Sequence, residues 1–285
     1  MINYLILLFG VFVTSWSSIL IRWIGDVHPL IITFYRLFLS VAVLLPFLIR
    51  QHKLSRIPLN RHSLFFLGLS GFFLSMHFFT WIQSLQWTSV GNSIFLESTH
   101  PVFALILSYL VLKEKGSRLI ILGIALALLG IYLIVSSDIS RSSSASVGDV
   151  LAILSAFFLA AYLLIARFYR QRMALIPYLI QVYAAAAIFT FILMLILKLN
   201  FLDLTAQNWF LLILLALGPN LIGHSLLNWA SRKMPVYLVN LAMQGEAVLA
   251  TLLAALLLKE IPGNQFYLGA LLILVAVSFI FWVKK

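Results

Sequence analysis

Glu97 and His100 lie one helical turn apart in an otherwise apolar stretch, FLESTHPVF (residues 95–103). The i, i+3 spacing places both side chains, together with Ser93, on one face of a helix. A carboxylate and an imidazole on one face can bind a cationic group or transfer a proton. E-x-x-H is also the spacing of di-iron sites, but those sites need two such motifs and two further glutamates. This chain has one motif, so we expect no metal and no cofactor.

The composition predicts a protein that lies in the lipid bilayer. Of the 285 residues, 63% are hydrophobic and 9% are charged, and the mean hydropathy is +1.10. A soluble domain has about 25% charged residues. The net charge of +11 would suit a nucleic-acid-binding protein, but the basic residues lie in the short segments between apolar stretches, so we expect no nucleic-acid partner. The chain has no cysteine, which excludes disulfides and thiolate metal sites.

Apolar segments of about 20 residues, the length that crosses a bilayer, predict the fold class. We expect an all-α membrane protein with ten transmembrane helices, the first of which is too long for a signal-peptide core and is retained. The ten segments cover residues 3–24, 29–49, 63–83, 89–112, 118–136, 149–169, 175–197, 208–229, 236–258 and 265–283. With a cytoplasmic N-terminus, 14 of the 19 basic residues lie in inner loops or at the C-terminus. The positive-inside rule therefore predicts that both termini are cytoplasmic.

The chain contains an internal repeat. The Ser-rich segment SDISRSSSASVGD (residues 137–149) follows the fifth apolar segment and separates two halves, residues 1–137 and 147–285. At an offset of 146, Lys113-Glu114 aligns with Lys259-Glu260. Five spans is an odd number, so the second copy must enter the membrane in the opposite orientation. Two inverted five-helix repeats predict a transporter that works by alternating access, with a duplicated structural bundle as the alternative.

Few ionisable residues fall at membrane depth, where a charge costs about 2.5–3.5 kcal/mol on insertion scales and usually faces a cavity or a partner. Glu97 and Glu246 are the two acids, and Glu246 takes the place of His100 in the repeat. We expect Glu246 and His100 to approach each other between the halves, with a packing hydrogen bond as the alternative role for each acid. Arg36 requires an anionic or carbonyl partner, for which Glu97 is nearest in depth; Arg36 either binds substrate or balances charge.

Aromatic, histidine and amide side chains complete the candidate site. His77 with Trp81, and His224 with Asn228, are i, i+4 pairs on their helices. A hydrogen-bonded packing role is the alternative for each intramembrane histidine. The candidate substrate-binding residues are Trp16, Arg36, His77, Trp81, Glu97, His100, Tyr162, His224, Asn228, Met243 and Glu246.

Two long segments resemble the halves of EamA-type proteins of the drug/metabolite transporter superfamily. They are QWTSVGNSIFLESTHPVFALILSYLVLKEK and IGHSLLNWASRKMPVYLVNLAMQGEAVLATLLAALLLKE. FYRLFLS, which contains Arg36, and GHSLLNWA, which contains His224 and Asn228, are also similar to that family's pattern. The resemblance implies ten spans, cytoplasmic termini, and a central cavity lined by spans 1, 3, 4, 6, 8 and 9. It also implies export of amino acids or other small metabolites.

These observations together predict a secondary transporter, and not an enzyme, in the bacterial inner membrane. The substrate is a small polar or zwitterionic metabolite, with amino acids as the first choice, and Glu97 and Glu246 are the candidates for proton coupling. An exporter of organic cations or drugs is the second hypothesis. A third is an intramembrane enzyme that acts on a lipid with Glu97 and His100 as an acid–base pair. The partners expected are the substrate and the bilayer, for a monomer or a dimer.

Overall fold

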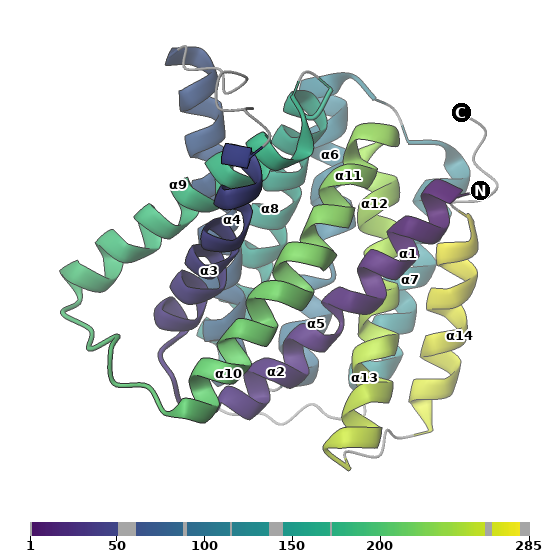
Figure 1. Ribbon diagram of the computed structural model, residues 1–285. Helices are drawn as coiled ribbons and strands as arrows, with labels where there is room; N and C mark the ends of the chain where they lie inside the picture. Colours follow the sequence, from purple (N-terminus) through teal and green to yellow (C-terminus); the bar gives the residue numbers. More distant parts are fainter. Residues whose placement is uncertain are drawn as a thin grey trace.

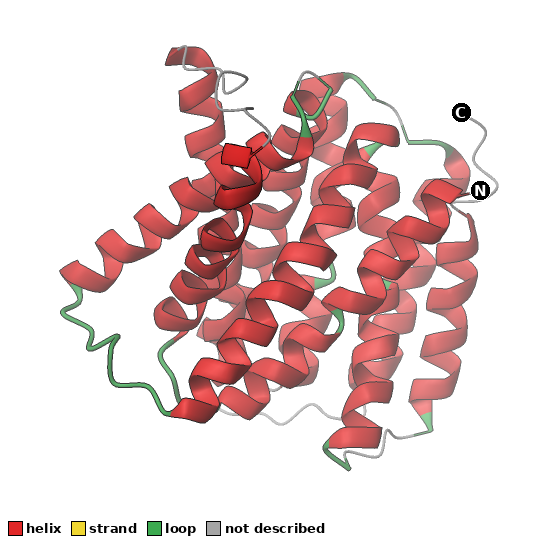
Figure 2. Cartoon of the chain, viewed as in Figure 1, coloured by secondary structure: helices red, strands yellow, loops and turns green. Residues whose placement is uncertain are grey.

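The computed structural model describes residues 2–50, 61–87, 90–114, 116–136, 145–171, 173–259 and 264–279. Within these ranges all regular structure is helical (Figure 2). A helix satisfies its backbone hydrogen bonds internally, as a segment in lipid must. The chain is therefore an all-α protein with the composition of a membrane protein, as the sequence predicts.

The helices of the first half are shown in Figure 1. They are α1 (Ile2–Thr14), α2 (Trp16–Ile24), α3 (Pro29–Arg50), α4 (Arg61–Trp87), α5 (Val90–Glu97), α6 (His100–Leu107), the π-helical segment η2 (Ser108–Leu112) and α7 (Arg118–Ser136). Gly25, with φ 74°, ends α2. Pro29 begins α3, at a position where its missing amide hydrogen costs nothing.

The remaining helices belong to the second half. They are α8 (Ala145–Tyr169), α9 (Leu175–Ile196), α10 (Ala206–Leu215), the π-helical segment η3 (Ala216–His224), α11 (Ser225–Lys233), α12 (Val236–Met243), α13 (Gly245–Leu257) and α14 (Gln265–Ser278). The side chain of Thr205 caps α10 by accepting a hydrogen bond from the Asn208 amide at 3.1 Å. Pro219 removes an amide donor inside η3, where the helix adopts the wider π winding.

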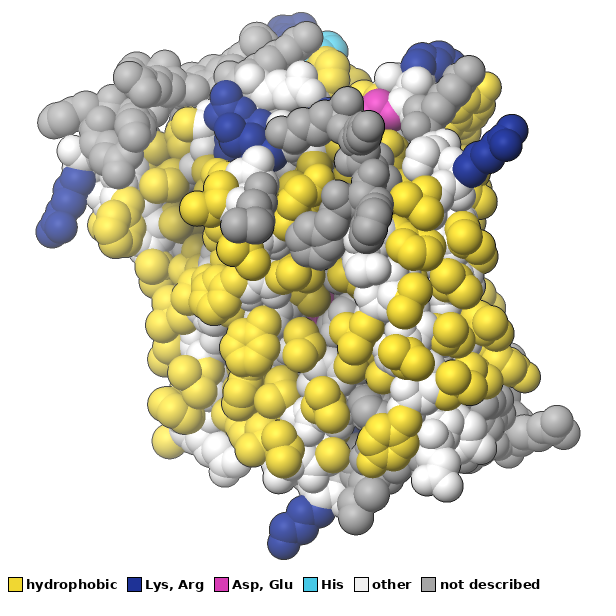
Figure 3. Space-filling view, turned by 90° about the vertical axis from the view of Figure 1, so that its right-hand side faces the viewer, with side chains coloured by type: hydrophobic (Ala, Val, Ile, Leu, Met, Phe, Trp, Pro, Cys, Tyr) yellow, Lys and Arg dark blue, Asp and Glu magenta, His cyan; other side chains and the backbone are white. Residues whose placement is uncertain are grey.

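Seven helical segments of the described chain are long and apolar enough to cross a membrane. They cover Ile2–Ile24, Pro29–Arg50, Arg61–Trp87, Val147–Tyr169, Leu175–Ile196, Ala206–Lys233 and Val236–Leu257. Three shorter apolar helices, His100–Leu112, Arg118–Leu133 and Tyr267–Ser278, fall at the remaining predicted spans. On the face shown in Figure 3, hydrophobic side chains cover the middle, and Lys and Arg side chains lie near the two ends. This distribution fits a protein that passes through the bilayer several times.

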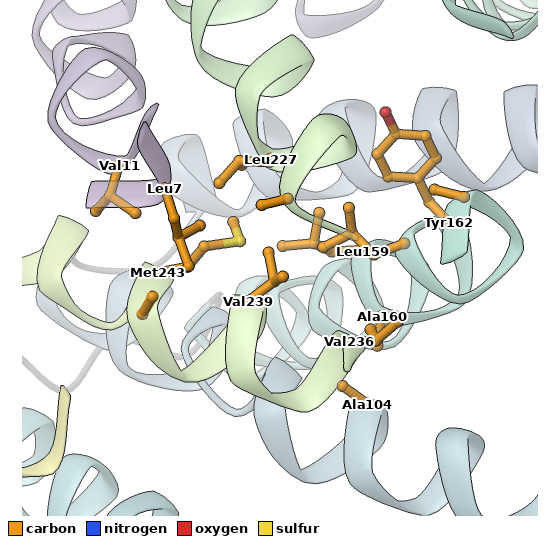
Figure 4. Close-up of a cluster of buried hydrophobic side chains, with 14 of the residues drawn as sticks. Leu7, Val11, Ala104, Leu159, Ala160, Tyr162, Leu227, Val236, Val239 and Met243 are labelled. Carbon is orange, nitrogen blue, oxygen red and sulfur yellow. The ribbon is translucent and has the colours of Figure 1, made fainter. Parts of the chain in front are cut away.

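Each half packs against the other through corresponding helices. α3 packs on α9, and α7 on α14, and these pairs correspond at the offset of 146. The α7–α14 contact is close at Gly130, where an added Cβ would lie 2.5 Å from the carbonyl oxygen of Gly269. Small residues permit this approach between membrane helices, whose association gains little from the hydrophobic effect. The buried cluster in Figure 4 likewise combines side chains of both halves, including Leu7 and Val11 with Leu159, Val239 and Met243.

Two local features of the backbone recur 146 positions apart. Helix α5 ends before Ser98 and Thr99, and the corresponding helix of the second half is interrupted at Gln244. Lys113 and Lys259 both adopt the left-handed conformation, with φ of 58° and 60°. Residues that are equivalent at the sequence offset of 146 therefore also share their backbone conformation at these two places.

Candidate functional site

Two adjoining pockets lie between the halves, near the interruptions of the spans. Both are lined by Trp81, Glu97, Met243 and Glu246. The first is also lined by Thr14, Ser17, His77, Phe78, Leu159 and His224, and the second by Ser18, Ile94, Ser98, His100, Ala247 and Ala250. Each has a volume of about 30 Å³, and a water molecule needs about 10–15 Å³. In this conformation the pockets have room for a few water molecules and not for a larger molecule.

The break between α5 and α6 follows from Pro101. Proline has no amide hydrogen, so the carbonyl of Glu97 loses its usual donor four residues later. The amide of Val102 then donates to Thr99 at 2.9 Å, which leaves the carbonyl of Ser98 free. Gln244 supplies the missing donor, because its Nε2 donates to the Ser98 oxygen at 3.0 Å. The interruption thus places Glu97 and Ser98 in the pocket wall and joins them to the second half.

Glu246 lies in the first turn of α13 and contacts the first half of the chain. The Thr14 hydroxyl is 3.0 Å from Glu246 Oε2 and 2.9 Å from the carbonyl oxygen of Val11. Glu246 and Glu97 repel each other when both are ionised, and the positive charge of Arg36 attracts Glu246. Both acids are partly exposed, and both line the pockets.

His100 is buried and held by the second half. Its Nδ1 lies 2.7 Å from Asn240 Oδ1, while Asn240 Nδ2 donates to the carbonyl of Val236 at 2.9 Å. Because the amide nitrogen is used on Val236, the amide oxygen faces the histidine, and Nδ1 of His100 is the donor. Nε2 then carries the lone pair and lies 3.5 Å from Gln244 Nε2. His100 and Glu246 line the same pocket, and each hydrogen bonds to another residue.

Arg36 does not pair with Glu97. Its side chain is fully buried in α3, and the guanidinium carbon lies 3.6 Å from the centre of the Phe78 ring. No carboxylate of a described residue lies within ion-pair distance of it. The expectation of an Arg36–Glu97 pair was wrong because depth along the bilayer does not fix the lateral position of a side chain. A cation over an aromatic face is attracted by the ring quadrupole. Phe78 lines the first pocket, and Arg36 lines neither pocket.

The remaining predicted residues divide between the pockets and the surrounding packing. Nδ1 of His77 lies 2.9 Å from the Ser155 hydroxyl, and its ring is parallel to that of Trp81, with centroids 6.4 Å apart. His224 meets Phe78 edge to face. Four of the predicted site residues line neither pocket: Trp16, Arg36, Tyr162 and Asn228.

Tyr162 and Asn228 bind each other. Asn228 Nδ2 donates to the Tyr162 hydroxyl and to the carbonyl of His224, the latter at 2.7 Å. Both side chains are completely buried. In this conformation they fix α8 against α11.

Sequence reasoning missed several residues at the pockets. Thr14, Ser17 and Phe78 line the first pocket, and Gln244 and Asn240 hold the wall of the second. The signal for Thr14 was present in TSWSS, a polar run inside the first apolar segment. Phe78 carried no signal, because it is one of 23 phenylalanines in the chain.

An ion pair joins three segments at one end of α8. Nη2 of Arg167, near the end of α8, lies 3.0 Å from Glu114 Oε1, and Nε lies 3.2 Å from the same oxygen. Nη1 donates to the carbonyls of Ser231 and Arg232 at the end of α11. One guanidinium therefore ties α8, α11 and the segment after η2 together.

A family model matches the chain over residues 1–136 and 146–282, and its description is EamA-like transporter family. The chain belongs to the EamA-like transporter family. It is a transporter-family membrane protein, in agreement with the resemblance seen in the sequence.

Two individual proteins and one solved structure are also similar to this chain. Two proteins of Archaeoglobus fulgidus, each described as an uncharacterized transporter, are 28% identical over 200 residues and 32% identical over 123 residues. These matches cover 68% and 42% of this chain, and 61% and 42% of the relatives. A solved crystal structure matches 98% of the EamA-like chain and 96% of its own chain, with a TM-score of 0.83 and 16% identity. That likeness shows the fold.

Proposed function

We propose that this EamA-like protein is a secondary transporter that exports a small polar or zwitterionic metabolite from the bacterial cytoplasm. Amino acids are the favoured substrates, and protons carried by Glu97 and Glu246 drive the transport. The observation that carries this proposal is the joint lining of two adjoining pockets by one glutamate from each half, with Trp81 beside them. Alternating access through two inverted repeats would expose these acids to each side in turn.

The arrangement of the helices supports an inverted repeat of residues 1–137 and 147–285. Helices that correspond at the offset of 146 pack on each other, and the contact of α4 with α8 has its counterpart in the contact of α10, η3 and α11 with α1 and α2. Five apolar segments precede the junction and five follow it. An odd number of spans per half inverts the second half relative to the first.

The ends of the helices support cytoplasmic termini. With each apolar segment crossing the bilayer, eight basic residues of the described chain lie at the end that contains the N-terminus, against three at the opposite end. The eight are Arg50, Arg61, Lys113, Arg118, Arg167, Arg170, Arg232 and Lys233, and the three are Arg22, Lys198 and Lys259. Positive charge favours the cytoplasmic side.

A zwitterion requires two kinds of contact, and the site offers both. Glu97 and Glu246 can accept hydrogen bonds from an ammonium group, and Trp81 provides an aromatic face for it. Arg36 lies behind Phe78 and can bind a carboxylate once that ring moves. In this scheme the two glutamates contact the substrate directly. Arg36 contacts the substrate only after the pocket widens.

Transport assays in proteoliposomes test the proposal. Purified protein should exchange a labelled amino acid from a mixture of twenty, and a proton gradient should accelerate net movement. Glu97→Gln should abolish the response to the gradient while the protein remains folded. Transport by Glu97→Gln at the normal rate and with the normal pH dependence would remove Glu97 from the mechanism.

Export of organic cations is the second candidate. It is favoured by the presence of two carboxylates and an indole in the pocket walls, while Arg36 stays outside them. Competition distinguishes the two functions, since a cation exporter would bind quaternary ammonium compounds and ignore amino acids.

A further inference from the structure

Thr14 lies at the break between α1 and α2, and its side chain contacts Glu246 in the second half. It is the last residue of α1, and Ser15 separates it from α2. Its side chain is buried, with the hydroxyl between Glu246 Oε2 at 3.0 Å and the carbonyl oxygen of Val11 at 2.9 Å. The methyl group faces η3, because a Cβ added to Gly223 would lie 2.5 Å from Thr14 Cγ2. The close helix contact thus fixes which way the hydroxyl points.

The two contacts of the Thr14 hydroxyl indicate whether the carboxyl group of Glu246 carries a proton. A threonine hydroxyl has one hydrogen to donate, and a backbone carbonyl can only accept. If Glu246 is ionised, Val11 and Glu246 compete for that hydrogen, and one of the two short contacts has none. If Glu246 Oε2 is protonated, it donates to Thr14 Oγ1, and Thr14 donates to Val11. The protonated acid therefore satisfies both contacts at once.

We propose that Thr14 is a positioning residue that holds the proton-bearing form of Glu246 and links it to the α1–α2 joint. The inference rests on the proposed function in one respect, that Glu246 carries a coupling proton. When the proton leaves, the hydroxyl must release either the last turn of α1 or the carboxylate of α13. Either change loosens the tie between the first span and the ninth, which is the step that opens the pocket.

Other charged and titratable groups surround Glu246, and a test must distinguish their effects from that of Glu246. Glu97 on α5, His77 on α4 and His224 of η3 line a pocket with it. His100 on α6 lines the other pocket, and Arg36 on α3 interacts with Glu246 electrostatically. A measurement on the carboxyl group itself, with matched variants, isolates Glu246.

Infrared spectroscopy of the purified full-length protein without substrate provides that measurement. A component of the protonated carboxylic acid carbonyl stretch should be present at neutral pH, be lost in Glu246→Gln and persist in Glu97→Gln, whatever Glu97 itself contributes to the band. In Thr14→Val, which keeps the methyl group against Gly223, the band should move to higher frequency because the acid loses its acceptor. Thr14→Ser keeps a hydroxyl that can accept from the acid but lacks the methyl group, so its band should lie closer to the wild-type frequency than that of Thr14→Val.

Two results would overturn the inference: no protonated-acid band that depends on Glu246, or a band that Thr14→Val leaves unchanged. Thr14→Ala serves as a second hydroxyl-free variant if Thr14→Val does not elute as a folded monodisperse protein, and it should shift the band in the same way. Because no substrate is present, a failure of amino-acid transport would leave the spectroscopic result intact. A shifted band without proton-dependent transport would contradict the proposed function and retain the link between Thr14 and Glu246.

Discussion

Gln244 donates a hydrogen bond from Nε2 to the carbonyl oxygen of Ser98, the residue 146 positions before it. These two residues are equivalent in the repeat, and both lie where a membrane span is interrupted. Equivalent positions can touch only near the axis that relates the two halves, so this bond marks the axis of the proposed inverted repeat. The residues on either side of it, Glu97 and Gly245, lead directly into the pocket walls.

Replacing Gln244 with leucine should destabilise the protein. The substitution removes the donor of a buried carbonyl, which costs about 1–3 kcal/mol when the acceptor is left unsatisfied. The apparent melting temperature in detergent should fall by several degrees. Gln181→Leu is the matched control, because Gln181 is partly buried and donates to the carbonyl of its own helix at Pro177. An equal effect of the two substitutions would show that the bond between the halves has no special importance.

Adding a methyl group at Gly223 should separate α1 from η3. The new Cβ would lie 2.5 Å from Thr14 Cγ2, and overpacking of this kind costs about 1–3 kcal/mol. Gly223→Ala should therefore lower the melting temperature and weaken proton-dependent transport. Gly218→Ala is the control on the same segment, since nothing lies within 4 Å of a Cβ there. Unchanged stability in Gly223→Ala would contradict the close contact.

Phe78→Leu should weaken the site that holds Arg36. The ring contact at 3.6 Å is desolvated, and such a cation–π interaction contributes about 2 kcal/mol. Phe73→Leu controls for the loss of an aromatic ring on α4, because Phe73 contacts only other phenylalanines among its described ring neighbours. A double-mutant cycle with Arg36→Met measures the coupling directly. A coupling energy near zero would show that Phe78 does not stabilise the buried guanidinium.

Arg167→Gln should open the end of the molecule that we assign to the cytoplasm. It removes the ion pair with Glu114 and the bonds to the end of α11. Because the chain has no cysteine, Met243→Cys gives a single label in the pockets without background. Labelling from the cytoplasmic side should rise about five-fold, which corresponds to about 1 kcal/mol for a partly exposed ion pair.

Arg232→Gln removes the same charge from the same end but leaves the Arg167–Glu114 pair in place. Labelling of Met243→Cys should therefore stay at the wild-type rate in this variant. Equal labelling of the two variants would attribute the effect to net charge and exclude a closing role for Arg167.

The positions of the helices followed from the sequence because apolar length and breaking residues act locally. The predicted segments 29–49 and 175–197 agree with α3 (Pro29–Arg50) and α9 (Leu175–Ile196) to within one residue. The interruption beside Glu97 also has a local cause in Pro101, which removes a hydrogen bond within its own helix. Residue types alone also indicated that Glu97 and Glu246 need a polar environment, and both line the pockets.

The partners of these side chains depended on the tertiary structure. Thr14 meets Glu246 across 232 residues, and His100 meets Asn240 across 140, so no local pattern could pair them. Arg36 stacks on Phe78 instead of approaching Glu97, because lateral helix packing, and not depth, sets which side chains touch. The sequence by itself determined where the apolar helices lie, since a run of apolar side chains is a property of each segment. Which polar groups hydrogen bond to each other was decided only when the helices packed together, because a hydrogen bond requires two atoms within about 3 Å of each other.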